Sequence, residues 1–169
     1  MEFLVSAADG SCRPRAAGGD RPLSSRLAVM NKSRTLEQLE ADVWSSPPAD
    51  GSPMVTRCHA LRKVPLEKLS AGDCRVLLTQ GIGTRYILPI ALDYVEADPL
   101  IEGDYYPGDL LLALLREPLD AWSRDKDGLG RLKSLARRID DTLTSDSDPQ
   151  GADKRLSKDI RAALAAHGA

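Results

Sequence analysis

Apolar side chains recur at helical spacing along most of the chain after residue 33. Separations of three and four residues predict helices at about 36–44, 53–63, 85–97, 129–143 and 154–167, with two more through CRVLLTQ at 74–80 and LLLALL at 110–115. No run alternates apolar and polar residues as a strand does, and no internal repeat is found. The pattern predicts an all-α fold, a single compact domain of about six to seven helices.

Capping residues support two of the predicted helix starts. Thr35 with Gln38, and Ser70 with Asp73, have the three-residue spacing of a capping box. In that motif each side chain accepts a hydrogen bond from a backbone amide that the first turn leaves free. Both helices are therefore expected to begin directly after these cap residues.

Glycines and prolines mark other predicted helix ends. Gly81 is placed to end a helix in the left-handed conformation, and Thr84 is predicted to cap the next helix. Pro89 falls inside that next helix and predicts a kink, because proline removes a backbone donor and clashes with the preceding turn. Pro107 is predicted to begin a further helix with Asp109 in its first turn, where the helix dipole favours an acid.

The first 33 residues show neither the helical nor the strand spacing of apolar residues, and they are rich in Gly, Ser, Arg and Pro. We predict that they are a disordered leader, because such a segment buries too little apolar surface to offset chain entropy. A polar NKSR follows Met30 and leads into a clean helix start, so we hypothesise that residues 1–29 are an appended or over-called start. The helical domain is predicted to span residues 34–169.

The charge balance argues against a protein dedicated to nucleic acid. The formal net charge is -2 and the isoelectric point about 5.7, whereas phosphate binding needs a concentrated positive surface. The basic residues Arg57, Arg62 and Lys63 are interpreted as a solvated helix face. No run is long and apolar enough to span a membrane, and the first residues lack the basic start of a secretory signal. We expect a cytoplasmic protein that contacts neither membrane nor nucleic acid directly.

The cysteines indicate neither a zinc site nor a disulfide framework. Cys12, Cys58 and Cys74 are odd in number and form no C-x-x-C pair, which fits a reducing compartment. Cys58 is expected to be a buried core residue. No cofactor is expected.

An acidic and aromatic connector, EADPLIEGDYYPGD at residues 96–109, separates two of the predicted helices. The densest group of acids in the chain lies in and just before it, and consists of Asp93, Glu96, Asp98, Glu102, Asp104 and Asp109. Carboxylates bind hard cations, but no calcium-loop pattern and no histidine accompanies these. Acid catalysis would need two carboxylates facing one cleft, which the spacing does not show.

Two interpretations of the acids remain more economical. Helix caps and a solvated face account for most of them individually. A binding surface is the other interpretation, because acids around exposed tyrosines meet a basic partner, and tyrosine is enriched among interface anchors. The adjacent Tyr105 and Tyr106 supply such tyrosines.

Four motifs in order resemble one family. TLEQLEADVW at 35–44, RCHALRKVPLEKL at 57–69, LLTQGIG at 77–83 and LPIALDYVEADPLIEGDYYPGDLL at 88–111 are similar to the immunity proteins of contact-dependent growth inhibition systems. The resemblance covers about Thr35 to Arg116, and its most specific parts are QGIG at 80–83 and EGDYYPGD at 102–109. Such proteins are small bacterial cytoplasmic proteins that bind and neutralise the toxin domain of a cognate effector.

The resemblance implies a binding protein with no reaction of its own. Its partner would be the C-terminal toxin domain of the effector, commonly a nuclease, whose basic cleft an acidic loop could occupy. A helical adaptor of another system is the alternative function, and a carboxylate-dependent hydrolase is the third. Gly103, Pro107 and Gly108 are assigned to the shape of the connector. The candidate toxin-binding residues are Asp98, Glu102, Asp104, Tyr105, Tyr106 and Asp109.

Overall fold

The computed structural model describes residues 31–145 and 151–168. This part of the chain forms seven α-helices and one 3-10 helix, and contains isolated β-bridges but no strand, so the all-α prediction is confirmed. The elements are α2 (Leu36–Glu40), α3 (Pro53–Leu61), η1 (Leu66–Lys68), α4 (Ala71–Thr79), α5 (Thr84–Ala97), α6 (Asp109–Arg116), α7 (Lys126–Ser145) and α8 (Gly151–Ala166).

The predicted leader falls mostly outside the described residues, which begin at Asn31. The last part of that stretch, residues 31–33, is fixed to the domain. The Glu67 amide donates to the carbonyl of Lys32 over 2.9 Å, and Lys32 Nζ lies 3.2 Å from a carboxylate oxygen of Asp93. Lys32 therefore contacts the helical domain, and the boundary at residue 34 stays a prediction.

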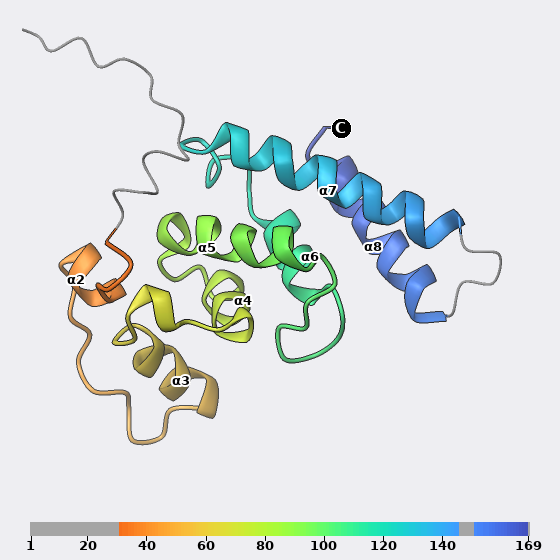
Figure 1. Cartoon of the computed structure of the whole chain (residues 1–169). Helices are drawn as coiled ribbons and strands as arrows, with labels where there is room; N and C mark the ends of the chain where they lie inside the picture. Colours follow the sequence, from red (N-terminus) through yellow and green to blue (C-terminus); the bar gives the residue numbers. More distant parts are fainter. Residues whose placement is uncertain (1–30, 146–150, 169) are drawn as a thin grey trace, which may run out of the picture.

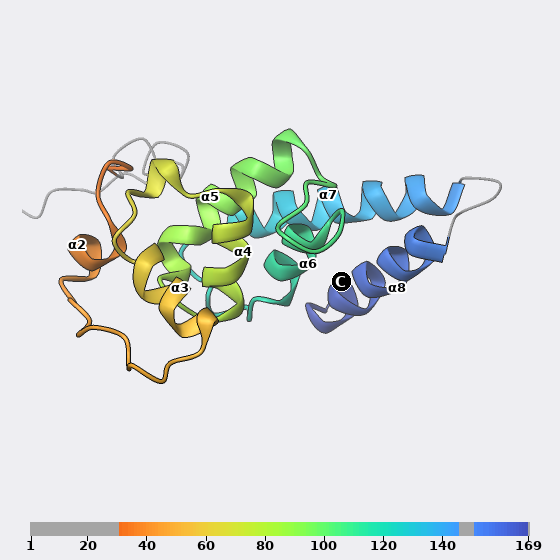
Figure 2. The same cartoon turned by 90° about the horizontal axis from the view of Figure 1, so that it is seen from below.

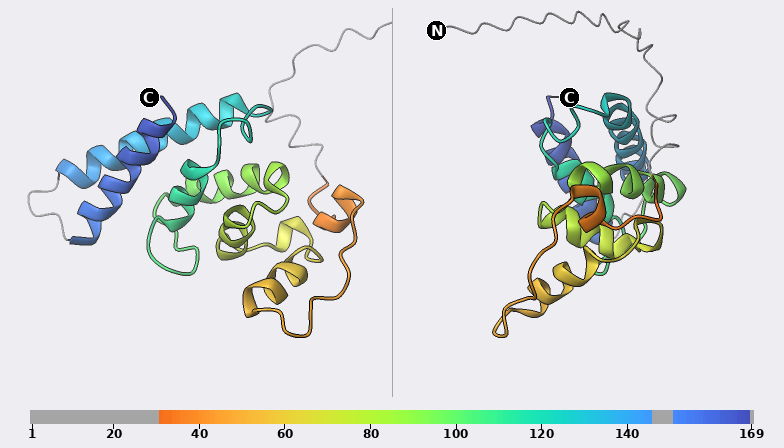
Figure 3. Two further views of the ribbon diagram at one scale, coloured as in Figure 1. Left: turned by 180° about the vertical axis from the view of Figure 1, so that it is seen from behind. Right: turned by 90° about the vertical axis from the view of Figure 1, so that its left-hand side faces the viewer.

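Helices α4, α5 and α6 pack against one another at the centre of the molecule (Figure 1). Helix α3 packs against α4, while α7 and α8 pair as a hairpin whose two helices both contact α6. Figure 2 shows this hairpin extending past the central helices, and Figure 3 places α2 and α3 at the opposite end of the molecule from α8. The segment between α5 and α6 thus leaves and rejoins the central group of helices.

Helix α6 is the most buried element. Its five leucines are all buried, as the unbroken apolar run LLLALL predicts for a helix covered on most sides. Trp122, in the turn after α6, is also buried, and Ile160 of α8 joins the same core. A buried leucine side chain stabilises a fold by about 1.5–3 kcal/mol, so α6 anchors whatever is attached to its first turn.

The predicted capping boxes are present. Thr35 Oγ1 accepts from the Gln38 amide while Gln38 Oε1 accepts from the Thr35 amide, and Ser70 and Asp73 exchange the equivalent pair of bonds. In the turn between α4 and α5, Gly81 has the predicted left-handed conformation, with φ of 66°, but the cap of α5 differs from its prediction. Gly83, with φ of 61°, is the N-cap of α5, and Thr84 is its first helical residue. Pro89 does lie inside α5, as predicted.

Helix α2 is shorter than its apolar spacing predicts. It ends at Glu40 because Ala41 adopts a left-handed conformation, and Val43, which the predicted helix at 36–44 includes, is 75% exposed. The chain changes direction at Ala41, and Glu40 and Asp42 on either side of it both contact Arg62. The guanidinium of Arg62 binds Glu40 at 2.6 Å and the carbonyl of Asp42 at 2.7 Å.

Arg62 therefore does not belong to a solvated face. Its side chain is 2% exposed and also lies over the ring of Trp44, 4.1 Å from the ring centre. A buried guanidinium is tolerated only where anions and acceptors surround it, and the α2–α3 segment supplies them. The prediction of a solvated Arg62 was wrong because its partners lie about 20 residues away in sequence.

The two described cysteines are core residues. Cys58, as predicted, and Cys74 are both buried free thiols. Burial raises the pKa of the Cys74 thiol to about 12, with a smaller contribution from the nearby Asp73 charge. Burial also raises the pKa of Cys58. Both thiols stay protonated at neutral pH, which suits apolar packing and not nucleophilic chemistry.

Two glycines of the α4–α5 turn give a matched test of this packing. A Cβ at Gly83 would lie 2.5 Å from a methyl group of the buried Leu36, whereas a Cβ at Gly81 would meet nothing within 4 Å. Both residues have positive φ, so alanine costs about 1–2 kcal/mol at either position. We expect Gly83→Ala to lower the free energy of unfolding by roughly 1–3 kcal/mol more than Gly81→Ala, measured by urea denaturation. Equal losses would contradict the close packing of Leu36 on the turn.

Candidate functional site

The part of the connector between α5 and α6, residues 98–108, is closed on itself. Asp98, the C-cap of α5, accepts a hydrogen bond from the Leu100 amide over 3.1 Å. The Gly108 amide donates to the carbonyls of Leu100 and Ile101, and an antiparallel bridge joins Glu102 to Pro107. Helix α6 begins at Asp109 and not at Pro107, because the bridge holds Pro107 in the loop.

Asp109 holds the connector from inside. Its side chain is 3% exposed, and its two carboxylate oxygens accept from the amides of Gly103 and Tyr105, the latter over 3.1 Å. Arg75 of α4 places its Nε 3.5 Å from the same carboxylate and also donates to the Gly103 carbonyl. Of the six candidate binding residues, Asp109 is thus the one that does not reach the surface.

Asp104 stands between two arginines. Its backbone has φ of 96°, a left-handed value that aspartate adopts more readily than most residues. Arg57 of α3 binds its carboxylate at 2.8 Å, and Arg75 lies 3.9 Å away. Asp104 is therefore partly exposed but already neutralised within the chain.

Arg57 also reaches Asp73, at 3.0 Å, and so ties α3, α4 and the connector together. Hydrogen bonds to Asp73 and Asp104 raise the pKa of the Arg57 guanidinium. Burial opposes ionisation of Asp73, but hydrogen bonds from Ser70 and Arg57 outweigh it and lower the pKa of this carboxyl. Both groups are charged at neutral pH, so this network fixes the loop electrostatically.

The two tyrosines form the exposed part of the loop. Tyr105 is 66% exposed and Tyr106 44%. The guanidinium carbon of Arg75 lies 4.2 Å from the centre of the Tyr105 ring, a cation–π contact that fixes the ring against α4. The loop thus presents two aromatic side chains whose backbone is held in place.

The remaining acids fall into two groups. Asp93 and Glu96, both on α5, pair with Lys32 and with Arg131 of α7. Asp98 and Glu102 are exposed and make no ion pair with any described residue. The carboxylates left for a partner are therefore those of Asp98 and Glu102.

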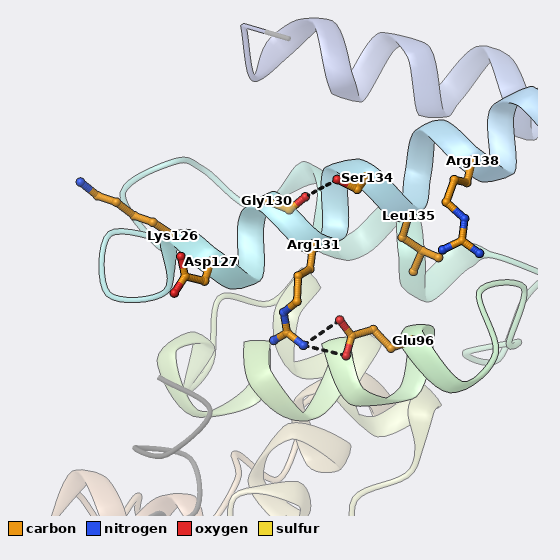
Figure 4. Close-up of a pocket in the computed structure, with 8 residues that line it drawn as sticks. All are labelled: Glu96, Lys126, Asp127, Gly130, Arg131, Ser134, Leu135 and Arg138. Carbon is orange, nitrogen blue, oxygen red and sulfur yellow. Dashed lines mark hydrogen bonds and ion pairs between the residues drawn. The ribbon is translucent and has the colours of Figure 1, made fainter. Parts of the chain in front are cut away.

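Two pockets flank this region. One, of about 280 Å³, is lined by α4, by the tyrosines of the connector and by α6. The other, of about 680 Å³, lies between α5 and α7, where Arg131 binds both carboxylate oxygens of Glu96 at 2.8 and 2.9 Å (Figure 4). Figure 4 shows Arg138 and Leu135 on the same face of α7 as Arg131. The larger pocket is rich in basic groups, opposite in sign to the connector.

The arginines that hold the loop carry no such role in the sequence pattern. Arg57 was assigned to a solvated face and Arg75 was given no role, because Asp104, which both arginines approach, lies in a distant segment of the chain. One local signal was present. Gly72 sits in the first turn of α4, and a Cβ there would lie 2.4 Å from a carboxylate oxygen of Asp104. A glycine at a helix start can thus mark the close approach of another segment.

The fold and the site define an all-α protein whose most distinctive surface is a preshaped acidic and aromatic loop. The chain belongs to the family of CDI immunity proteins, the immunity proteins of contact-dependent growth inhibition, whose family model matches residues 38–132. This match covers more than half of the chain, includes the whole connector and confirms the resemblance. A comparison with curated proteins gives no match.

Family membership indicates a bacterial protein that acts in toxin neutralisation by binding a toxin protein, in a family that is generally not enzymatic. Among the described helices none is both long and apolar enough to cross a membrane. Within residues 31–145 and 151–168, no three His, Cys, Asp or Glu side chains are grouped so as to hold a metal ion.

The internal role of Asp109 can be tested against Asp98. Asp109→Ala leaves two connector amides without an acceptor, and we expect it to lower the free energy of unfolding by about 2–4 kcal/mol. Asp98→Ala removes one exposed hydrogen bond and should cost no more than about 1 kcal/mol. Urea denaturation followed by circular dichroism measures both. A loss for Asp109→Ala as small as that for Asp98→Ala would show that the loop does not depend on this carboxylate.

Proposed function

We propose that this chain neutralises the C-terminal toxin domain of its cognate growth-inhibition effector by binding it through the surface of the connector. The observation that carries the proposal is the combination of family membership with a loop that is exposed yet held rigidly from within. A rigid loop loses little conformational entropy when it binds, so more of its contact energy appears as affinity.

The charges of the loop favour a basic partner. Arg57 and Arg75 pair with Asp104 and Asp109, whereas Asp98 and Glu102 have no ion-pair partner in the described chain, so the loop keeps an acidic surplus. A nuclease needs a basic cleft to hold its phosphate substrate. We therefore propose that the toxin is a nuclease whose cleft the acidic loop occupies, and that the chain itself contacts neither nucleic acid nor membrane.

The six candidate residues divide by role in this proposal. Asp98 and Glu102 meet cationic groups of the toxin directly, because no partner in the described chain neutralises them. Tyr105 and Tyr106 act as aromatic anchors, since exposed tyrosine supplies a large contact area with few rotatable bonds. Asp104 and Asp109 contribute by holding the loop in shape. The protein acts in this scheme by occupying the toxin, in the cytoplasm where the toxin works, and without a reaction of its own.

Co-expression tests the function. The chain, with and without residues 1–29, is produced beside the toxin domain encoded immediately upstream, and cell survival and co-purification are scored. We expect survival and a stable complex with either form, because the connector and its supports lie within the described domain. Cell death without a complex would reject neutralisation for that pair and favour the adaptor function.

Charge reversal tests the surface. Glu102→Lys should weaken toxin binding by about tenfold or more, because it replaces an attractive charge by a repulsive one. Asp127→Lys, the same reversal of charge at an exposed site in the first turn of α7, is the control and should leave the affinity within about threefold. Calorimetry at two salt concentrations measures both, and binding of the unmodified chain should weaken as salt rises. Equal affinities for the two variants would remove Glu102 from the interface.

A further inference from the structure

The smaller pocket beside the connector has three walls. Arg75, Leu78 and Thr79 of α4 form one wall, and Tyr105 with Tyr106 forms the second. The third wall is the outer face of α6, with Ala113 and Arg116, and it continues to Glu117, the C-cap of that helix. The volume is about 280 Å³, and Asp109 lies at the base of the connector beside it.

Among the residues that the structure describes, the charged side chains of this pocket are already paired, with one exception. Arg75 is bound to Asp109 and to the Gly103 carbonyl, Thr79 donates to the carbonyl of Arg75, and Arg116 faces Asp159 at 4.0 Å. In the part of the chain that the structure describes, the Glu117 carboxylate makes neither an ion pair nor a side-chain hydrogen bond.

Burial raises the pKa of Glu117, because the pocket disfavours its charged form. Its immediate chain neighbour, Arg116, points to α8 and does not neutralise it. A half-buried carboxylate without a counter-ion costs stability in the free protein, and a cation supplied from outside would offset that cost.

We propose that this pocket is a socket for one lysine or arginine side chain of the toxin, with Glu117 as its counter-ion. The inference rests on the proposed function and extends the interface from the connector across α6. Leu78, Ala113 and the tyrosine rings would line the aliphatic stem of the incoming side chain, while its charged end meets Glu117. An anionic side chain would be repelled by the same carboxylate, and an apolar one would leave it uncompensated.

The socket and the acidic loop fit the same partner. Glu102 and Asp98 attract a basic surface over a distance, whereas the pocket accepts one side chain in a defined position. Electrostatic attraction mainly speeds encounter, and a buried charged contact mainly slows dissociation. The two parts of the surface therefore predict different kinetic signatures.

Glu117→Gln tests the socket with little change of shape. We expect the dissociation rate of the toxin complex to rise about tenfold, with an association rate changed by less than about threefold. Glu67→Gln, the same change at an exposed glutamate of η1, is the matched control and should bind as the unmodified chain does. At neutral pH Glu117→Gln should unfold at the same or a higher temperature, because it removes a charge that burial disfavours.

A second variant blocks the socket from within. Ala113→Lys places an ammonium one helical turn before Glu117, where it can pair with that carboxylate. We expect the variant to keep its helical circular dichroism and to lose affinity for the toxin by at least as much as Glu117→Gln. Unchanged affinity in both variants, with Glu102→Lys still weakening the complex, would overturn the socket and leave the proposed function intact. Failure of the unmodified chain to bind the toxin would reject both.

Discussion

The shape of the connector depends on one buried carboxylate. Asp109 is an integral part of α6, yet its oxygens bind amides of Gly103 and Tyr105 and lie beside the guanidinium of Arg75. A charge taken from water is tolerated only with such a shell of donors, and its position in the first turn of α6 adds the favourable helix dipole. Because α6 is the most buried helix, the loop that closes around its first residue is fixed to the core.

This anchoring separates two kinds of acid in the connector. Asp104 and Asp109 are bound by arginines from α3 and α4, and their charges hold the loop in place. Asp98 and Glu102 lie outside that network and keep their charge for a partner. Tyr105 and Tyr106 are exposed, and the backbone amide of Tyr105 is held by Asp109. A surface organised in this way combines long-range attraction with rigid aromatic contacts, as the proposed binding of a basic toxin requires.

The C-terminal hairpin extends past the residues that define the family. The family match ends at residue 132, within α7, so α8 lies beyond it. Helix α8 nevertheless packs on α6, where Leu156 lies within 3.2 Å of the position a Cβ on Gly108 would take. At the C-terminal end of α6, the ring of His167 forms a hydrogen bond with the carbonyl of Leu115. The hairpin thus braces both ends of the helix that carries the connector.

The sequence by itself determined the helices, the two capping boxes and the burial of α6, because these depend on spacing and on contacts within about one helical turn. It also marked the connector, whose turn residues and acids are adjacent in the chain. Only the tertiary structure decided which acids are free. Asp109 and Asp98 look alike in sequence, but one is enclosed by Arg75 and two amides, and the other faces solvent. The arginines that bind Asp104 and Asp109 come from segments as many as 47 residues away, as between Arg57 and Asp104, and the spacing of residues in the sequence does not predict such a pairing.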